Sequence, residues 1–233
     1  MIDVSIELLF FAIGSFVVMF FVGGIIIQSI PYKLNVKWRS ESLEYIDSSN
    51  EPIFEDFKMA VRSKFILSAL ATIVSALVIY TNGPNIDSYV FSIFFVILVL
   101  LVGINNKHLL IPDIIVWPLI WSGLIYQSYV GDNLEYYLYS VLIAFSLIFI
   151  LQQFYIHIKG FEILGGGDLK MFMAIGAWFG YELLPAFFAI CFFTGLTIGL
   201  LASFTNRFHA KGTSVIYLIS ALIIYFNANS LSI

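Results

Sequence analysis

Long apolar runs separated by short polar segments organise the chain. Eight of them are candidates for membrane-spanning helices, because a helix of about 20 residues crosses a hydrocarbon core of roughly 30 Å. The predicted spans are 5–28, 65–81, 89–104, 112–130, 135–156, 169–181, 184–204 and 213–229. The sixth is short for a crossing, so we expect it to be half-buried in the bilayer or shielded by protein.

Composition agrees with an all-α, polytopic membrane protein. The 233 residues are 61% hydrophobic and 11% charged, whereas soluble domains carry about 25% charged residues. The single cysteine, Cys191, lies inside an apolar run and is interpreted as a packing residue. It cannot form an intramolecular disulfide, and no Cys/His cluster points to a metal site.

The basic residues all fall on one side of the predicted spans. They are Lys33, Lys37, Arg39, Lys58, Arg62, Lys64, Lys107, Lys159, Lys170, Arg207 and Lys211. The loops on the opposite side contain none, so the positive-inside rule places the basic side in the cytoplasm and both termini outside.

The largest polar segment is the predicted cytoplasmic loop 31–64. Its stretch FKMAVRSK, residues 57–64, favours an interfacial helix with basic side chains toward anionic lipid headgroups. A plain linker with positive-inside charges is the alternative. We treat 1–233 as one membrane domain that contains this segment.

Three carboxylates border spans on the cytoplasmic side: Asp113, Glu162 and Asp168. Charges at this depth are costly and indicate a function by default. Asp168 follows three glycines and opens a helix, so capping of that helix accounts for it locally. The glycines also permit close backbone approach or positive φ, which favours a site. Asp113 lies beside Pro112 in a similar capping arrangement.

Two stretches together resemble the type IV prepilin peptidase family, which are membrane aspartic proteases of the GxGD type. GGGDLK, from Gly165 to Lys170, matches the family's GxGDxK, and AIGAWFG at 174–180 matches its usual continuation. LLIPDIIVWPLIWSGLI at 109–125 looks like the stretch that follows the family's first catalytic aspartate. FAIGSF at 11–16 and Ile30-Pro31 are similar to its GSF…P region.

The resemblance implies cleavage of the leader peptide of type IV prepilins or pseudopilins at the cytoplasmic face of the bacterial inner membrane. Two carboxylates would share a water, one taking its proton while the other polarises the scissile carbonyl. Asp168 would be one of them. Gly165, Gly166 and Gly167 would provide backbone freedom for the substrate, with Lys170 and Asp113 as support. Hydrolysis needs no metal or cofactor, and no nucleic acid partner is expected beside the prepilin and membrane lipid.

The chain departs from the family pattern at the position of the second catalytic carboxylate, the partner of Asp168. The family's first catalytic aspartate lies eight residues before the aspartate that matches Asp113, and that position is Asn105. An amide has the same shape but cannot ionise. We favour an Asp→Asn change made to inactivate the protease; a natural pseudo-peptidase and substitution by Asp113 are the alternatives. This chain is therefore expected to be inactive as written.

Many family members also N-methylate the product with S-adenosylmethionine, and longer members carry two CxxC pairs in the loop after the first span. The segment 31–64 has no cysteine, which leaves the methyltransferase activity open.

Two other classes of protein remain as alternatives: a non-catalytic pilin-binding or assembly protein, and a small proton- or ion-coupled transporter. An aspartate at position 105 of the wild-type sequence would favour the protease, and an asparagine the binder.

Overall fold

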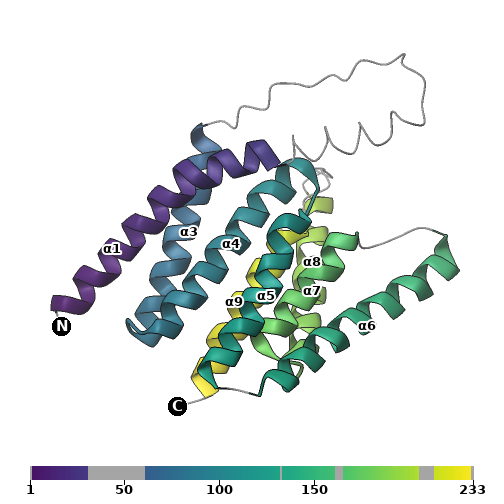
Figure 1. Cartoon of the computed structure of the whole chain (residues 1–233). Helices are drawn as coiled ribbons and strands as arrows, with labels where there is room; N and C mark the ends of the chain where they lie inside the picture. The colour runs from purple at the N-terminus through teal and green to yellow at the C-terminus, as the bar shows by residue number, and fades with distance from the viewer. Residues whose placement is uncertain (1, 31–60, 132, 161–164, 205–212, 232–233) are drawn as a thin grey trace. The chain divides into compact units, whose positions relative to one another are not determined.

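A computed structural model of the chain describes residues 2–30, 61–131, 133–160, 165–204 and 213–231 (Figure 1). These residues form helices and short connections, without a strand among them, which confirms the all-α prediction. The elements are α1 Ile2–Val18, the π-helix η1 Met19–Gly23, α3 Val61–Asn82, α4 Ile86–His108, α5 Asp113–Val130, α6 Leu134–Lys159, α7 Gly166–Phe179, α8 Leu184–Phe204 and α9 Ser214–Leu231. Helical backbone also continues from η1 to Ile30.

Each predicted span falls on one of these helical segments. Five helical stretches in the described part of the chain are long and apolar enough to cross a membrane: Leu8–Ile30, Val61–Asn82, Ile86–Asn106, Leu134–Lys159 and Leu184–Leu201. Ser214–Ala228 is a shorter apolar helix. The chain is a multi-pass membrane protein.

The predicted loop 31–64 ends earlier than expected. Residues 31–60 lie outside the described residues, and so does the first half of the predicted interfacial stretch. Val61 to Lys64 are the first turn of α3, not part of a linker. Lys64 is tolerated there because its alkyl stem lies along Gly24, where an added Cβ would stand 3.1 Å from it.

The chain forms two compact units, residues 1–108 and residues 109–233. The prediction of a single membrane domain over 1–233 stays a prediction. In the first unit, α3 packs against both α1 and α4 (Figure 1). Phe94, Phe95 and Leu101 on α4 are fully buried in it.

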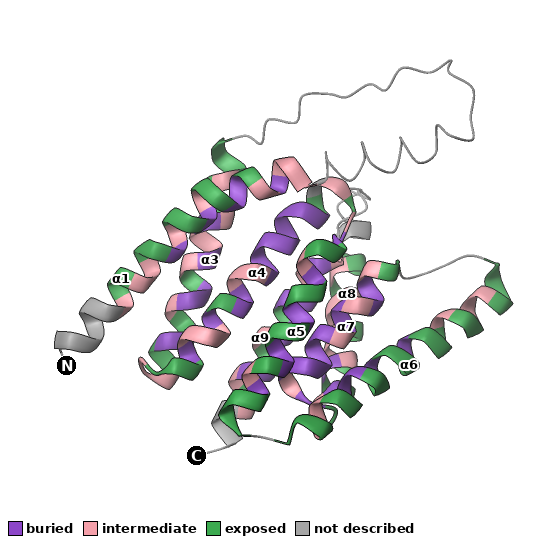
Figure 2. Cartoon of the chain, viewed as in Figure 1, coloured by how far each residue is buried: buried purple, intermediate pink, exposed green. Residues whose placement is uncertain are grey.

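In the second unit, α7 is the most enclosed helix: it packs against α5 and α6, and nine of its 14 residues are buried (Figure 2). The short sixth span is therefore shielded by protein. Close backbone approach makes this packing possible, because a Cβ on Gly176 would stand 2.7 Å from the Ser140 carbonyl oxygen of α6. Trp178 is 4% exposed. Its indole donates to the Leu119 carbonyl at 2.9 Å, which makes it a packing residue and not an interface anchor.

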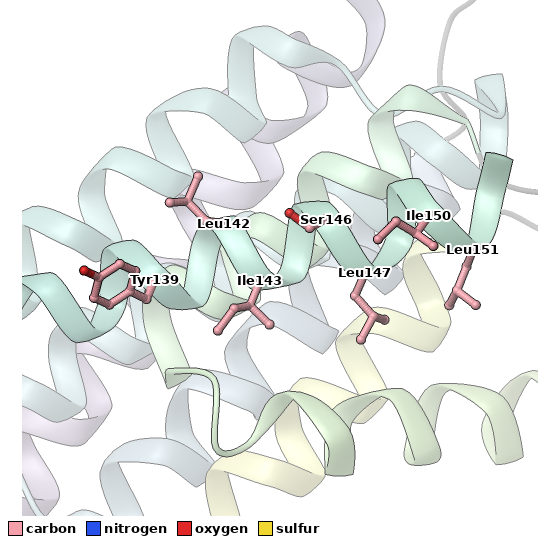
Figure 3. Close-up of a pocket in the computed structure, with 7 residues that line it drawn as sticks. All are labelled: Tyr139, Leu142, Ile143, Ser146, Leu147, Ile150 and Leu151. Atoms are coloured by element: carbon pink, nitrogen blue, oxygen red, sulfur yellow. The ribbon is translucent and has the colours of Figure 1, made fainter. Parts of the chain in front are cut away.

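The buried residues of α6 are Ser140, Val141, Ala144 and Ile148, and none of its residues after Ile148 is buried. One face of α6 carries a shallow, almost wholly apolar pocket (Figure 3). It is lined by Tyr139, Leu142, Ile143, Ser146, Leu147, Ile150 and Leu151. A long apolar face open on the outside of its unit is what a helix in contact with lipid tails presents.

Candidate active site

Asp168 lies in the first turn of α7 and is 9% exposed. The N-cap of α7 is Gly165, so Asp168 stands three residues inside the helix and not at the cap itself. Its Oδ2 accepts the Gly165 backbone N–H at 2.9 Å, and its own N–H donates to the Gly165 carbonyl at 3.0 Å. The predicted capping role is thus present, but it occupies only one carboxylate oxygen.

The other oxygen of Asp168 is held by two hydroxyls from the last helix. Thr213 Oγ1 donates to Oδ1 at 2.6 Å and Tyr217 Oη donates to it at 2.8 Å. Thr213 immediately precedes α9 and Tyr217 lies in its first turn, four residues later, so the two hydroxyls lie on the same side of the helix start. Sequence reasoning missed both of them. The available signal was a pair of hydroxyl side chains at helical spacing at the beginning of an apolar run.

The three glycines before Asp168 differ in what they contribute. Among the described glycines, positive φ occurs at Gly83, Gly131, Gly160 and Gly180, and none of these precedes Asp168 directly. At Gly167 an added Cβ would stand 2.7 Å from Ile111 Cβ and 3.0 Å from its carbonyl oxygen. Gly165 and Gly166 are exposed and unobstructed. Of the two expected uses of glycine, the close approach is the one present here, at Gly167.

Asp113 and Lys170 form an ion pair between the N-terminal ends of α5 and α7. Asp113 is the first residue of α5; it makes no capping hydrogen bond there, because Pro112 is the N-cap and has no side-chain acceptor. The side chain of Lys170 is 23% exposed, and that of Asp113 is 57% exposed. Lys170 Nζ also lies 6.0 Å from the ring centroid of Trp117. The two predicted supporting residues are therefore brought together by the fold.

Asn105 lies near the end of α4, three residues before His108, and is 4% exposed. It belongs to the unit of residues 1–108, whereas Asp168 belongs to the other unit. That Asn105 occupies the position opposite Asp168 stays a prediction. Glu162, the third carboxylate singled out from the sequence, lies outside the described residues.

Loss of a hydroxyl that binds Asp168 should destabilise the fold. We expect Tyr217→Phe to lower the free energy of unfolding by about 1.5–3 kcal/mol, the usual contribution of a hydrogen bond to a charged group. Thermal unfolding in detergent measures the effect. Tyr129→Phe, at a residue 77% exposed, is the matched control. If Tyr217→Phe costs as much in an Asp168→Ala background as in the parent, the hydrogen bond is not the cause.

The fold and the site define a helical multi-pass membrane protein with a buried carboxylate that accepts three hydrogen bonds. Residues 92–200 match the type IV leader peptidase family. The matched region includes Asn105, Asp113 and Asp168. The matched region ends before the α9 hydroxyls that bind Asp168.

Curated relatives agree with this match. The chain is 34% identical over 110 residues to a prepilin leader peptidase/N-methyltransferase of Dickeya chrysanthemi, covering 46% of this chain and 38% of the relative. It is 30% identical over 147 residues to one of Legionella pneumophila, covering 63% and 51%, and 29% identical over 147 residues to one of Aeromonas salmonicida, covering 60% and 49%. The matched part thus spans about half of these relatives or less. No solved structure matches the chain.

Proposed function

We propose that the chain is a membrane aspartic endopeptidase that cleaves the leader peptide of type IV prepilins or pseudopilins. The observation that carries the proposal is that both carboxylate oxygens of Asp168 accept hydrogen bonds. A carboxylate that only capped its helix would need one oxygen, yet the second oxygen is bound by the hydroxyls of Thr213, just before α9, and Tyr217, in α9. Such binding orients a buried carboxylate and limits its rotamers, as a catalytic group requires.

In this proposal, hydrolysis uses one water between two carboxyl groups. The ionised carboxylate takes a proton from the water as its oxygen attacks the scissile carbonyl carbon. The protonated partner donates a hydrogen bond to the carbonyl oxygen, and the C–N bond then breaks with proton transfer to the leaving amine. The amide of Asn105 can neither take nor donate that proton, so the chain as written binds substrate without cutting it.

Asp113 is a poor replacement for the missing partner. Its carboxylate is engaged by Lys170, and more than half of its side-chain surface is open. A catalytic dyad needs two carboxyl groups close enough to share a proton, and the groups that reach Asp168 Oδ1 in the described part of the chain are hydroxyls of Thr213 and Tyr217. These contacts count against Asp113 as the second carboxylate; the proposal of position 105 rests on its spacing of eight residues from Asp113, which matches the family pattern.

We further propose that the site faces the cytoplasm in the bacterial inner membrane, with both termini on the periplasmic side. The support is the one-sided distribution of all eleven basic residues along the chain. Asp168 and Lys170 lie at the same end of α7, so the carboxylate is near the basic side of the membrane. The substrate would be an N-terminal leader followed by an apolar helix.

Methylation is a separate part of the proposal. The relatives are named both peptidases and N-methyltransferases, and S-adenosylmethionine would be the methyl donor here. Transfer of radiolabelled methyl groups to a previously cleaved pilin tests this activity without depending on residue 105. Absence of label on the pilin, with a functional relative as positive control, would leave the chain a peptidase alone.

Binding of an intact substrate tests the proposed function in the chain as written. Purified chain in detergent is expected to retain a full-length prepilin on an affinity resin and to leave its leader attached. A pilin that lacks its leader is the control and should be retained less well. Equal retention of the two proteins would count against a peptidase that recognises the leader, and failure to retain either would count against a pilin-binding protein as well.

A further inference from the structure

The two carboxylate oxygens of Asp168 differ in how many hydrogen bonds they accept. Oδ1 accepts the hydroxyls of Thr213 and Tyr217. Since a carboxylate oxygen has two lone pairs, this oxygen is filled. Oδ2 accepts the backbone N–H of Gly165, and no other group in the described part of the chain donates to it. One lone pair of Oδ2 is therefore left for a reactant.

Oδ2 also lies beside a space that a side chain on residue 165 would occupy. A Cβ added to Gly165 would stand 3.6 Å from Oδ2, and no other described atom outside the neighbouring residues comes within 4 Å of that point. The backbone does not require glycine here, because φ −74° and ψ 162° are extended values that any residue adopts. Gly165 is exposed, so its missing side chain leaves the approach to Oδ2 open.

The hydroxyl of Tyr217 at Oδ1 is fixed by the packing of its ring. The ring is buried, and its centroid lies 5.3 Å from that of Phe172 and 6.4 Å from that of Phe187. Phe172 is one turn after Asp168 on α7, so both residues lie on the same face of that helix. The face that bears the carboxylate thus also holds the ring that supplies its donor.

We propose that Oδ2 of Asp168 is the oxygen that takes the proton in catalysis, and that the missing side chain of Gly165 keeps the approach to this oxygen open. Thr213 and Tyr217 are positioning residues, because they hold Oδ1 and so fix the direction in which Oδ2 faces. All three partners donate to the carboxylate, which suits its anionic, proton-accepting form. The inference deepens the proposed function and rests on it for the reaction, but not for the difference between the two oxygens.

The step at Oδ2 is a proton transfer coupled to the attack of water. An O–H bond of the water breaks, and its proton passes to the lone pair of Oδ2 that no described donor occupies. The water oxygen forms the new bond to the scissile carbonyl carbon, and the π electrons of the carbonyl move to the carbonyl oxygen. Oδ1 keeps both of its hydrogen bonds, so the carboxyl group does not have to turn during the transfer.

Labelling of Asp168 by a hydrophobic carbodiimide tests the proposal without catalysis, because a carboxyl oxygen must attack the reagent. The chain as written is labelled in detergent, and mass spectrometry follows the modified peptide. We expect Gly165→Val to slow labelling of Asp168 by roughly 10-fold, which corresponds to a steric cost near 1.4 kcal/mol. Gly166→Val is the matched control, since a Cβ on Gly166 meets nothing within 4 Å, and should leave the labelling rate unchanged.

Removal of both hydroxyls gives the second comparison. In a Thr213→Val/Tyr217→Phe chain, Oδ1 becomes a second reactive oxygen, so Gly165→Val should slow labelling much less than in the parent. Equal labelling rates in Gly165→Val and Gly166→Val would overturn the assignment of Oδ2. The same slowing by Gly165→Val with and without the two hydroxyls would overturn their role in holding Oδ1.

Kinetics of an Asn105→Asp chain test the positioning role in catalysis. Tyr217→Phe should lower kcat by roughly 10- to 100-fold, the effect of a lost hydrogen bond to a charged group, with little change in KM. Thr213→Val should lower kcat as well, whereas Thr213→Ser keeps the hydroxyl and should retain activity. Thr197→Val, at an exposed threonine of α8, is the control.

The kinetic results separate this inference from the proposed function. A raised KM with unchanged kcat in Tyr217→Phe would overturn the positioning role, and so would equal losses in Thr213→Ser and Thr213→Val. If the Asn105→Asp chain shows no cleavage at all, the proposed function fails, while carbodiimide labelling still decides which oxygen of Asp168 is open.

Discussion

Replacing Asn105 with aspartate is expected to convert a chain that leaves a prepilin intact into one that removes its leader peptide. The change adds the one ionisable group that the proposed mechanism lacks, at a position that is 4% exposed near the end of α4. A gain on the order of 10³-fold in cleavage rate is expected, within the range that positioned acid–base groups contribute. Mass spectrometry of the released leader, with the protein in detergent, measures it.

Two variants control for this result. Asn105→Gln keeps the amide and should stay inactive, and Asn105→Asp/Asp168→Asn should lose the gained activity because the pair again has a single carboxylate. Substantial cleavage by the chain as written, abolished by Asp113→Ala, would contradict the assignment of position 105. A folded Asn105→Asp chain without activity would contradict the proposed peptidase.

Gly176→Leu is expected to destabilise the second unit strongly. A Cβ at this position would stand 2.7 Å from the Ser140 carbonyl oxygen and 3.0 Å from its carbonyl carbon, which are backbone atoms that a rotamer change cannot move. Overpacking typically costs about 1–3 kcal/mol, and 1 kcal/mol shifts Tm by about 2–4 °C in a chain of this size. We therefore expect Tm to fall by roughly 2–12 °C in detergent.

Gly199→Leu is the matched control for that substitution. Gly199 lies on α8, and an added Cβ there meets nothing within 4 Å, so the same change in side chain should leave Tm almost unaltered. Gly176→Ala should lie between the two. Equal losses at Gly176 and Gly199 would show that helix propensity or bilayer insertion, and not the contact between α6 and α7, determines the effect.

Much of the secondary structure follows from local hydrophobicity. The predicted span 184–204 has the same bounds as α8, and 135–156 lies within α6. A helix satisfies its backbone hydrogen bonds within one segment, so apolar length and the polar residues at its ends are enough to place it in a membrane. The loop boundary at 64 was wrong because Val61 to Lys64 continue directly into the apolar run of α3.

Part of the candidate site could likewise be predicted from neighbouring residues in the sequence, and part could not. Asp168 and its backbone contact with Gly165 lie three residues apart, so the GGGDLK stretch by itself indicated both a cap and a carboxylate worth explaining. Tyr217 is 49 residues from Asp168, and Lys170 is 57 residues from Asp113. The spacing of these residues along the sequence predicts neither pairing.

The amino-acid sequence by itself determined an all-α membrane protein, the approximate ends of its helices, and the residues that deserved attention: Asp168, Asn105, Asp113 and Lys170. Only the tertiary structure decided that α7 is enclosed, that the hydroxyls of Thr213 and Tyr217 bind Asp168, and that Asp113 pairs with Lys170. The physical reason is that helices in a bilayer are apolar on most of their surface. The hydrophobic pattern of such a helix therefore says little about which face packs against a neighbouring helix. Small residues and side-chain packing determine that face instead.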